Sequence, residues 1–141
     1  MIVVDASVAV KWLIEEPGSA AAAAVLESDR GVLFAPDLVS VEVAGALSRR
    51  VRDGRFSPED ARAGYDKWSL LLDQESLTLK RTDEFLTRAF EIALEAKHAL
   101  PDCVYLACAE LLGVPVLTAD HAMYERGRRV YDRIELLPTA A

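Results

Sequence analysis

The chain begins with a short apolar run that ends on an acid, and this feature constrains the fold more than any other. Ile2, Val3 and Val4 precede Asp5, and Ser7 follows two positions later. A β-branched run without polar alternation is typical of a central strand in a parallel sheet that is covered on both faces. Ligands of open α/β sheets bind beyond the carboxyl ends of such strands. We therefore predict that Asp5 lies at the mouth of a binding crevice, although it is equally suited to cap the next helix.

The same pattern returns late in the chain. Residues 114–118 form another apolar strand, and Asp120 follows it closely. A hydroxyl again lies two positions from the acid, since Thr118 precedes Asp120 as Ser7 follows Asp5. Because parallel strands end at the same edge of a sheet, the two aspartates are predicted to lie at one edge.

Between these strands, apolar runs alternate with segments of helical periodicity that Pro and Gly residues separate. This alternation predicts an α/β fold with a mainly parallel central sheet, and the last segment, 130–137, suits an edge strand. The remaining expected strands cover residues 32–35 and 77–79. The expected helices cover residues 6–14, 37–53 and 103–112, and others begin at Ser19 (ending at Gly31), at Ser57 and at Asp83.

Glu42 lies in the predicted helix over 37–53 at a position where an acid is unexpected. Its neighbours three and four residues away are all apolar or small, so its carboxylate projects from the apolar stripe of the helix. A charge in that position is costly unless something pairs with it. The alternative is a rotated helix in which Glu42 lies at the rim of the core.

Asp102 stands at the start of an almost wholly apolar helical segment, which is typical of a buried helix. It follows Pro101 in the expected first turn, where the helix dipole favours an anion, so capping alone could explain it. His98 lies four residues earlier. We interpret His98 as a turn residue, because Pro101 is expected to break the helical register that would pair it with Asp102.

Composition limits the class of protein. The net charge of −7 argues against a protein that coats nucleic acid non-specifically, although basic islands over 49–55 and 126–133 could form a phosphate-binding groove or solvated helix ends. The chain is 52% hydrophobic but has no apolar run near the roughly 18 residues of a membrane span, so we expect a globular cytoplasmic protein. Cys103 and Cys108 are too poorly aligned on one helix to bridge, and we interpret them as core residues.

Four carboxylates that converge on one site need a cation. At an effective dielectric of about 20, two like charges about 4 Å apart repel by about 4 kcal/mol. Ligand sets of oxygen alone favour Mg²⁺ or Mn²⁺, which retain water ligands and bind substrate phosphates. The candidate metal-binding and catalytic residues are Asp5, Glu42, Asp102 and Asp120.

The order and context of these acids resemble the PIN-domain nucleases and, at this chain length, the VapC toxins of type II toxin–antitoxin pairs. The similarity spans nearly the whole chain. It is carried by Asp5 in IVVDAS, Glu42 in PDLVSVEVA, Asp102 in LPDCVYLA and Asp120 in VLTAD. Ser7 and Thr118 match positions where the family often has a hydroxyl or amide near the metal-bound water, and we include them as supporting residues.

The resemblance implies a three-layer α/β/α sandwich around a mainly parallel sheet, built as a single PIN-like domain over residues 1–141. It also implies a homodimer that cleaves RNA with Mg²⁺ or Mn²⁺ and that a small antitoxin protein holds inactive. Asp5, Glu42 and Asp102 would then bind the metal or position its water, and Asp120 would complete the site. On charge alone, substrate phosphates are expected at Lys11 or at the island over 126–129.

Other classes fit less well. A phosphoryl-accepting signalling domain also has acids at strand ends but needs a late lysine, and no lysine follows Asp120. A haloacid-dehalogenase-type phosphatase needs a second aspartate two residues after Asp5, where Ser7 stands. Within the PIN family, a housekeeping nuclease of RNA maturation and a non-catalytic binding module stay open. The small size favours the toxin over the first, and the complete set of acids argues against the second.

Overall fold

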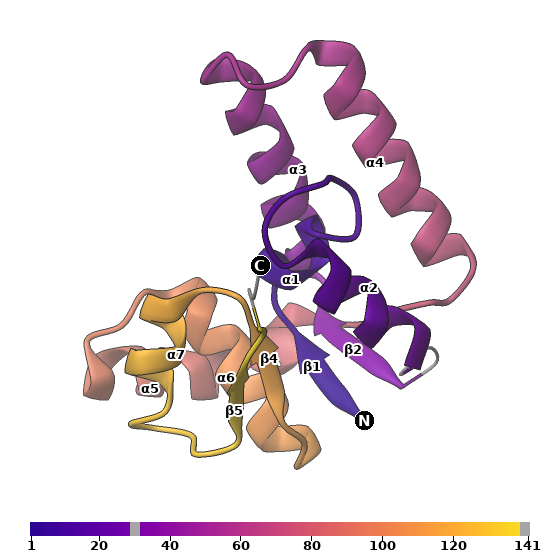
Figure 1. Ribbon diagram of the computed structural model, residues 1–141. Helices are drawn as coiled ribbons and strands as arrows, with labels where there is room; N and C mark the ends of the chain where they lie inside the picture. Colours follow the sequence, from indigo (N-terminus) through magenta and orange to yellow (C-terminus); the bar gives the residue numbers. More distant parts are fainter. Residues whose placement is uncertain (29–31, 139–141) are drawn as a thin grey trace.

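A five-stranded sheet forms the centre of the molecule, and each of its strands runs parallel to its neighbours (Figure 1). The computed structural model describes residues 1–28 and 32–138. The strands, in the spatial order β3-β2-β1-β4-β5, are β1 (Ile2–Val4), β2 (Leu33–Pro36), β3 (Thr78–Lys80), β4 (Val116–Thr118) and β5 (Ile134–Leu136). The predicted α/β class and parallel sheet are confirmed, and β5 is an edge strand as expected.

The strand order reverses beside β1. The chain moves outward from β1 to β2 and β3, then returns to place β4 on the other side of β1, with β5 beyond it. Val3 of β1 pairs with both Phe34 of β2 and Val116 of β4, so β1 is the central strand. In open α/β sheets, a crevice for ligands lies where the order reverses, here at the carboxyl ends of β1 and β4.

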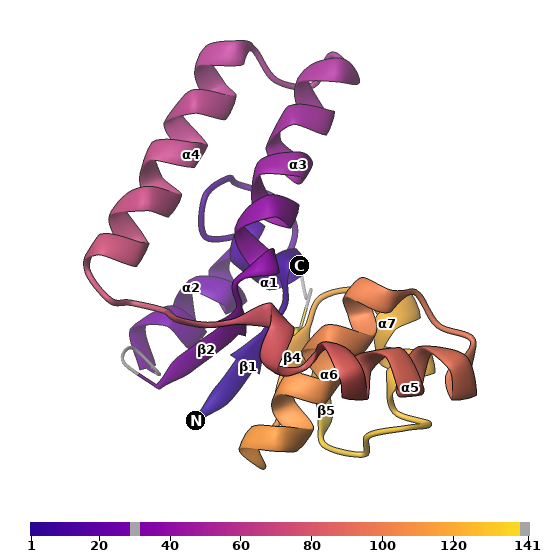
Figure 2. The same ribbon diagram turned by 180° about the vertical axis from the view of Figure 1, so that it is seen from behind.

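Helices cover both faces of this sheet. Connections between parallel strands are right-handed, so the direction in which the chain moves along the sheet decides which face a connection covers. The chain moves one way from β1 to β3 and the other way from β3 to β5, so the two sets of connections lie on opposite faces. Figures 1 and 2 accordingly show α1 to α4 grouped on one side of the molecule and α5 to α7 on the other, with the α3–α4 hairpin extending beyond the sheet. The helices are α1 (Ala6–Val10), α2 (Ser19–Ser28), α3 (Leu38–Arg52), α4 (Pro58–Asp73), α5 (Leu86–Ala96), α6 (Leu100–Leu112) and α7 (His121–Gly127), with the 3₁₀ turn η1 (Thr82–Glu84) before α5.

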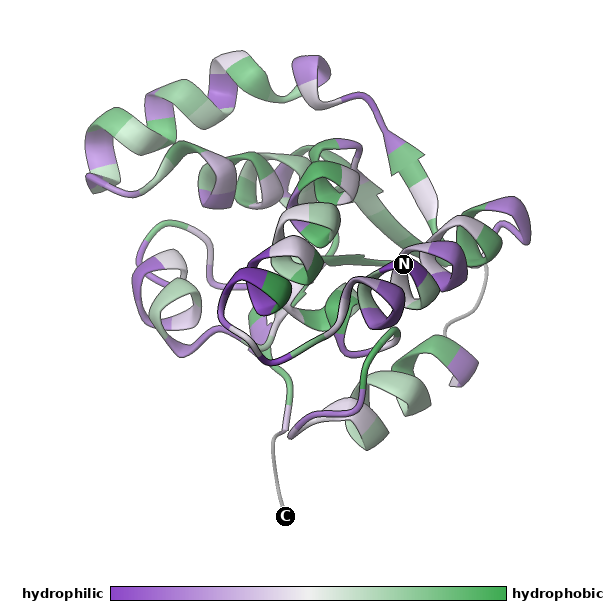
Figure 3. Ribbon diagram, turned by 90° about the horizontal axis from the view of Figure 1, so that it is seen from above, coloured by the Kyte–Doolittle hydropathy of each residue, from purple (hydrophilic) through white to green (hydrophobic). Residues whose placement is uncertain are grey.

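The core lies on both faces of the sheet and includes residues of α1, α3, α4 and α6. Figure 3 shows hydrophobic and hydrophilic residues alternating along the outer helices. Every residue of α6 from Cys103 to Ala109 is buried, as the apolar sequence of this helix predicts. Both cysteines are free thiols, and burial raises the pKa of Cys103 to about 11 and that of Cys108 to about 12. They therefore remain protonated near neutral pH, which agrees with their interpretation as core residues.

Several boundaries differ from those expected. Helix α6 begins at Leu100, three residues earlier than predicted, because Pro101 fits the first turn of a helix, where no N–H bond is lost. Helix α1 ends at Val10, and the following residues form turns. The predicted end of the second helix at Gly31 lies outside the described residues. In the part of the chain that is described, no helix is both long and apolar enough to cross a membrane.

Candidate active site

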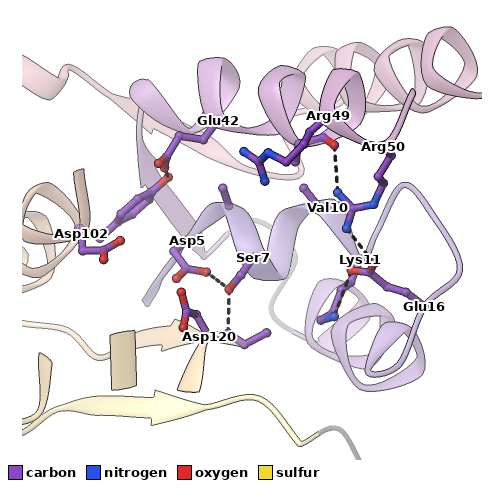
Figure 4. A pocket seen from close by; sticks show the side chains of 14 residues that line it. Asp5, Ser7, Val10, Lys11, Glu16, Glu42, Arg49, Arg50, Asp102 and Asp120 are labelled. Atoms are coloured by element: carbon purple, nitrogen blue, oxygen red, sulfur yellow. Dashed lines mark hydrogen bonds and ion pairs between the residues drawn. The ribbon is translucent and has the colours of Figure 1, made fainter. Parts of the chain in front are cut away.

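The four candidate acids converge on one pocket where β1 and β4 end side by side (Figure 4). The pocket has a volume of about 340 Å³ and is open to solvent. Figure 4 shows an acidic end and a basic end. The acidic end contains Asp5, Ser7, Glu42, Asp102 and Asp120, and the basic end contains Lys11, Glu16, Arg49 and Arg50.

Asp5 is held by hydrogen bonds to both of its oxygens. It is the N-cap of α1, and Oδ1 accepts a bond from the backbone N–H of Val8 at 3.3 Å. The Ser7 hydroxyl donates to the same oxygen, and the Thr118 hydroxyl at the end of β4 donates to Oδ2. The residue is only 5% exposed. Asp5 therefore both caps a helix and faces the pocket, and Ser7 and Thr118 orient it directly.

Asp120 repeats this arrangement at the end of β4. It is the N-cap of α7, where Oδ1 accepts backbone bonds from Ala122 at 2.8 Å and Met123 at 3.2 Å. Its own N–H donates to the Thr118 hydroxyl at 3.1 Å. Thr118 thus links the two aspartates at the edge of the sheet. Unlike Asp5, Asp120 is exposed, so it stands on the solvent side of the acidic end.

Glu42 has the partner that its position in α3 calls for. The hydroxyl of Tyr105, which is buried in α6, donates to Glu42 Oε1 at 2.6 Å. Glu42 itself is partly exposed and lines the pocket, so it lies at the boundary between the core and the site. This contact joins helices on opposite faces of the sheet, and 63 residues separate its two partners in the chain.

Asp102 lies in the first turn of α6, and His98 lies beside it. The distance from His98 Nε2 to Asp102 Oδ2 is 3.6 Å. The expectation that Pro101 would keep these two side chains apart is therefore wrong. The proline lies within the first turn instead of ending the register, so His98, just before the helix, approaches the residue four positions later. His98 is buried, whereas the Asp102 side chain is 32% exposed.

Burial raises the pKa of Asp5, Glu42 and Asp102, and neighbouring acids add to the rise. Burial raises the pKa of Asp5 from 3.8 to about 6, against the hydrogen bonds from Ser7, Thr118 and Val8, and the Asp102 charge adds to the rise. Burial, with the Asp102 charge, also raises the pKa of Glu42, although the Tyr105 hydrogen bond opposes this.

Asp102 interacts electrostatically with each of the other three acids. Burial is the main cause of its raised pKa, and the Asp120 charge adds to it, while the guanidinium charge of Arg126 opposes the rise, as a protonated His98 would. Its charge in turn acts on both Asp5 and Glu42. A bound cation would oppose all of these pKa rises, because a nearby positive charge favours the charged form of each carboxylate.

The donor set fits a hard divalent ion that keeps its waters. No three acidic, histidine or cysteine side chains within residues 1–28 and 32–138 lie close enough to form a complete metal cage. Mg²⁺ does not need one, since it commonly binds through one or two carboxylates and retains several water ligands. A pocket of about 340 Å³ has room for such a hydrated ion. The residues available to hold it, directly or through water, are Asp5, Glu42, Asp102 and Asp120.

Replacing Tyr105 with phenylalanine is expected to weaken Mn²⁺ binding about tenfold. A hydrogen bond to a charged group contributes about 1.5–3 kcal/mol, and its loss removes a contact that favours the charged form of Glu42. Titration calorimetry measures the affinity. The matched control is Tyr131→Phe. It removes a hydroxyl that lies outside the pocket and donates to the Val114 carbonyl at 2.6 Å. Equal losses in the two variants would contradict a role specific to Tyr105.

The basic end of the pocket is organised around Glu16. Lys11 donates to Glu16 Oε1 at 3.0 Å, and Arg50 donates to Glu16 Oε2 at 2.9 Å. These hydrogen bonds and charges lower the pKa of Glu16 despite its partial burial. Arg49 is exposed, and its guanidinium extends toward the acids in Figure 4. Of the two islands considered from charge, the pocket contains part of the first, whereas residues 126–129 do not line it.

A parallel α/β sheet with an oxygen-rich acidic pocket at its point of strand reversal, flanked by cations, defines a class of protein. Carboxylates that can hold a divalent ion beside arginine side chains are suited to phosphate-containing substrates. The fold and pocket therefore indicate a metal-dependent enzyme of phosphoryl chemistry.

Comparison with known proteins identifies the family. A family model described as PIN domain matches residues 2–129. Ribonuclease VapC12 of Mycobacterium tuberculosis is 34% identical over 122 residues, which cover 85% of this chain and 87% of that protein. Ribonuclease VapC1 of the same organism is 34% identical over 122 residues (84% of each), and Ribonuclease VapC3 of Pyrobaculum aerophilum is 31% identical over 127 residues (89% and 93%). The chain belongs to the PIN-domain family.

Sequence reasoning missed several contacts in and beside the pocket. Tyr105 had a detectable signal, because it lies three residues after Asp102 and so shares its helix face. His98 had one too, at four residues before Asp102 with a proline that suits a first helical turn. Glu16 had none, and the basic island over 49–55 did not show that Arg50 would bond to it, since the two meet only when the loop after α1 packs on α3.

Proposed function

We propose that this PIN-domain protein is a metal-dependent endoribonuclease, the toxin of a type II toxin–antitoxin pair, and that residues 1–141 form a single domain. The observation that carries the proposal is the convergence of Asp5, Glu42, Asp102 and Asp120 on one pocket in a chain similar to VapC ribonucleases. The all-oxygen donor set favours Mg²⁺ or Mn²⁺ as the ion. The buried free thiols of Cys103 and Cys108 suit the reducing cytoplasm, where we place the protein.

The roles of the acids follow from their positions. When bound, the ion supplies a water of lowered pKa for attack on phosphorus and neutralises charge on the phosphate. Asp5, fixed by hydrogen bonds on both oxygens, offers a preorganised ligand in the proposed site. Glu42 and Asp102 approach from α3 and α6 and would hold the ion or orient its waters. Asp120, the most exposed of the four, would complete the site on the side from which substrate enters.

Arg49 is the proposed contact for a substrate phosphate. Lys11 and Arg50 both donate hydrogen bonds to Glu16, whereas Arg49 forms no ion pair within the described residues. An exposed guanidinium beside a carboxylate site can bind a phosphate oxygen of the RNA chain and place the next phosphodiester bond at the acids. In this assignment Lys11 has a supporting role, and the island over 126–129 lies outside the pocket.

Arg49→Gln is expected to weaken RNA binding about tenfold and to reduce the slope of log affinity against log salt by about one. Both effects follow from the loss of one phosphate contact. Binding is measured by fluorescence anisotropy in an Asp102→Asn background, so that the RNA stays intact. Arg52→Gln is the matched control, because Arg52 lies in the last turn of the same helix and does not line the pocket. A salt slope equal to that of the control would contradict the assignment.

An antitoxin and a second copy of the chain are the proposed partners. A toxin needs an inhibitor, and a cationic side chain of the antitoxin would suit the acidic end of the pocket. A homodimer is supported by α5, where Leu86, Phe90 and Leu94 follow each other at four-residue spacing and are 42%, 53% and 60% exposed. Such a stripe is typical of a protein contact.

The test is to incubate the purified, antitoxin-free protein with total cellular RNA and Mg²⁺ or Mn²⁺ and to map the new RNA ends. Discrete cuts that disappear with chelator and in Asp102→Asn are expected. Metal binding without any cleavage would instead favour the non-catalytic binding module. Growth arrest on expression, relieved by co-expression of an antitoxin, separates a toxin from a housekeeping nuclease of RNA maturation.

A further inference from the structure

His98 is a buried imidazole whose protonation can be assigned from its hydrogen bonds. It lies in the short linker between α5 and α6, and its side chain is 1% exposed. Its Nδ1 accepts a hydrogen bond from the backbone N–H of Ala99 at 2.9 Å. An imidazole nitrogen that accepts a hydrogen bond carries no proton, so the single ring proton of the neutral form is on Nε2.

The Nε2–H group has no hydrogen-bond partner among the described residues, although it is fully buried. A buried donor without a partner costs free energy, so such groups are rare in folded proteins. The facing acceptor is Asp102 Oδ2 at 3.6 Å, slightly beyond hydrogen-bond distance. Because the Asp102 side chain is partly exposed, it can move toward His98, whereas the imidazole is enclosed.

We propose that His98 is a positioning residue for Asp102: its Nε2–H donates to Oδ2 and leaves Oδ1 to face the ion. The proposal rests on the metal site of the proposed function. Donors of this kind fix the orientation of a ligand, and their loss typically weakens metal binding 10–100-fold. The competing explanation is that His98 only fills space in the linker, in which case a ring of similar shape without N–H would serve equally well.

The tautomer is tested by NMR of ¹⁵N-histidine-labelled protein. His98 and His121 are the chain's two histidines, and exposed His121 serves as an internal control. Long-range ¹⁵N–¹H correlations should show the neutral His98 ring as one tautomer, with Nε2 protonated and Nδ1 unprotonated. Addition of Mg²⁺ should move the His98 Nε2 signal more than that of Nδ1. A neutral ring with its proton on Nδ1 would overturn the assignment.

The positioning role is tested by Mn²⁺ titration of two variants. His98→Phe keeps the ring and loses the donor, so its affinity should fall at least tenfold. His98→Gln places an amide N–H near the former Nε2, and should keep affinity within about threefold of the wild type. His121→Gln is the surface control. Should His98→Phe fail to fold, His98→Asn replaces it, because its shorter amide does not reach the Nε2 position. Equal affinities in the donor-bearing and donor-free variants would overturn the proposal.

The outcomes separate this inference from the proposed function. Wild-type metal binding and RNA cleavage in His98→Phe would refute the positioning role and leave the nuclease intact. Metal binding that depends on the His98 donor, in a wild-type protein that cuts no RNA, would support the positioning role and refute the nuclease. A wild-type protein that binds no Mn²⁺ would refute both.

Discussion

Replacing Asp102 with asparagine is expected to lower the rate of RNA cleavage by about 10²–10³-fold while the protein stays folded. Asp102 is the acid whose charge acts on both Asp5 and Glu42, so its loss changes the field of the whole acidic end. Preorganised electrostatic groups in active sites commonly contribute effects of this size. Asparagine has nearly the same volume, and the side chain is partly exposed, so little packing is lost.

The measurement is the single-turnover cleavage rate of a defined RNA in Mn²⁺, with thermal unfolding recorded for the same preparations. Asp73→Asn is the matched control, because Asp73 is an exposed aspartate at the end of α4 and lies outside the pocket. The control should cut at the wild-type rate. A folded Asp102→Asn protein that cuts as fast as the control would remove Asp102 from the site.

Asp5→Asn is expected to abolish cleavage and, at the same time, to stabilise the metal-free protein above pH 6. The pKa of Asp5 is about 6 in the folded protein and 3.8 ordinarily, so folding favours its protonated form. Protonation of Asp5 therefore stabilises the folded protein. This contribution is fully present below pH 3.8 and is lost as the pH rises to about 6. The difference corresponds to about 3 kcal/mol at most, which the uncharged asparagine should recover.

Urea unfolding in chelator at pH 7.5 and at pH 4 measures this effect. The variant should be more stable than the wild type at the higher pH, and the difference should nearly vanish at the lower. Added Mn²⁺ should reverse the order at pH 7.5, because only the wild type gains the binding energy of the ion. An Asp5→Asn protein that is less stable than the wild type at both pH values would show that capping and the bonds from Ser7 and Thr118 outweigh the buried charge.

Two of the candidate acids could be placed from the sequence because strand ends are local features. An apolar run followed by Asp5, and another followed shortly by Asp120, are each visible within a few residues, and parallel strands bring their ends to one edge. Glu42 was detectable as an acid on an apolar helix stripe. The sheet order itself was not, since strand pairing depends on contacts between distant segments.

The site was less predictable where two helices meet. Tyr105 reaches Glu42 only because α3 and α6 take particular rotations about their axes at the sheet edge. The prediction for His98 was wrong because proline has opposite effects at two positions: it breaks a helix in the interior and is favoured in the first turn, where Pro101 lies. Which one applies depends on where α6 begins, and that depends on its packing against the sheet and α5.

The sequence by itself determined the class of fold, the acidic chemistry and the edge of the sheet at which that chemistry lies. These follow from periodicity, strand ends and residue type, which act over short stretches of chain. Only the tertiary structure decided that Arg49 and the Glu16 cluster stand beside the acids and that the Nε2–H of His98 faces Asp102. These contacts depend on how whole helices and strands pack against one another. Packing involves many residues that are far apart in the chain, so a short stretch of sequence does not predict it.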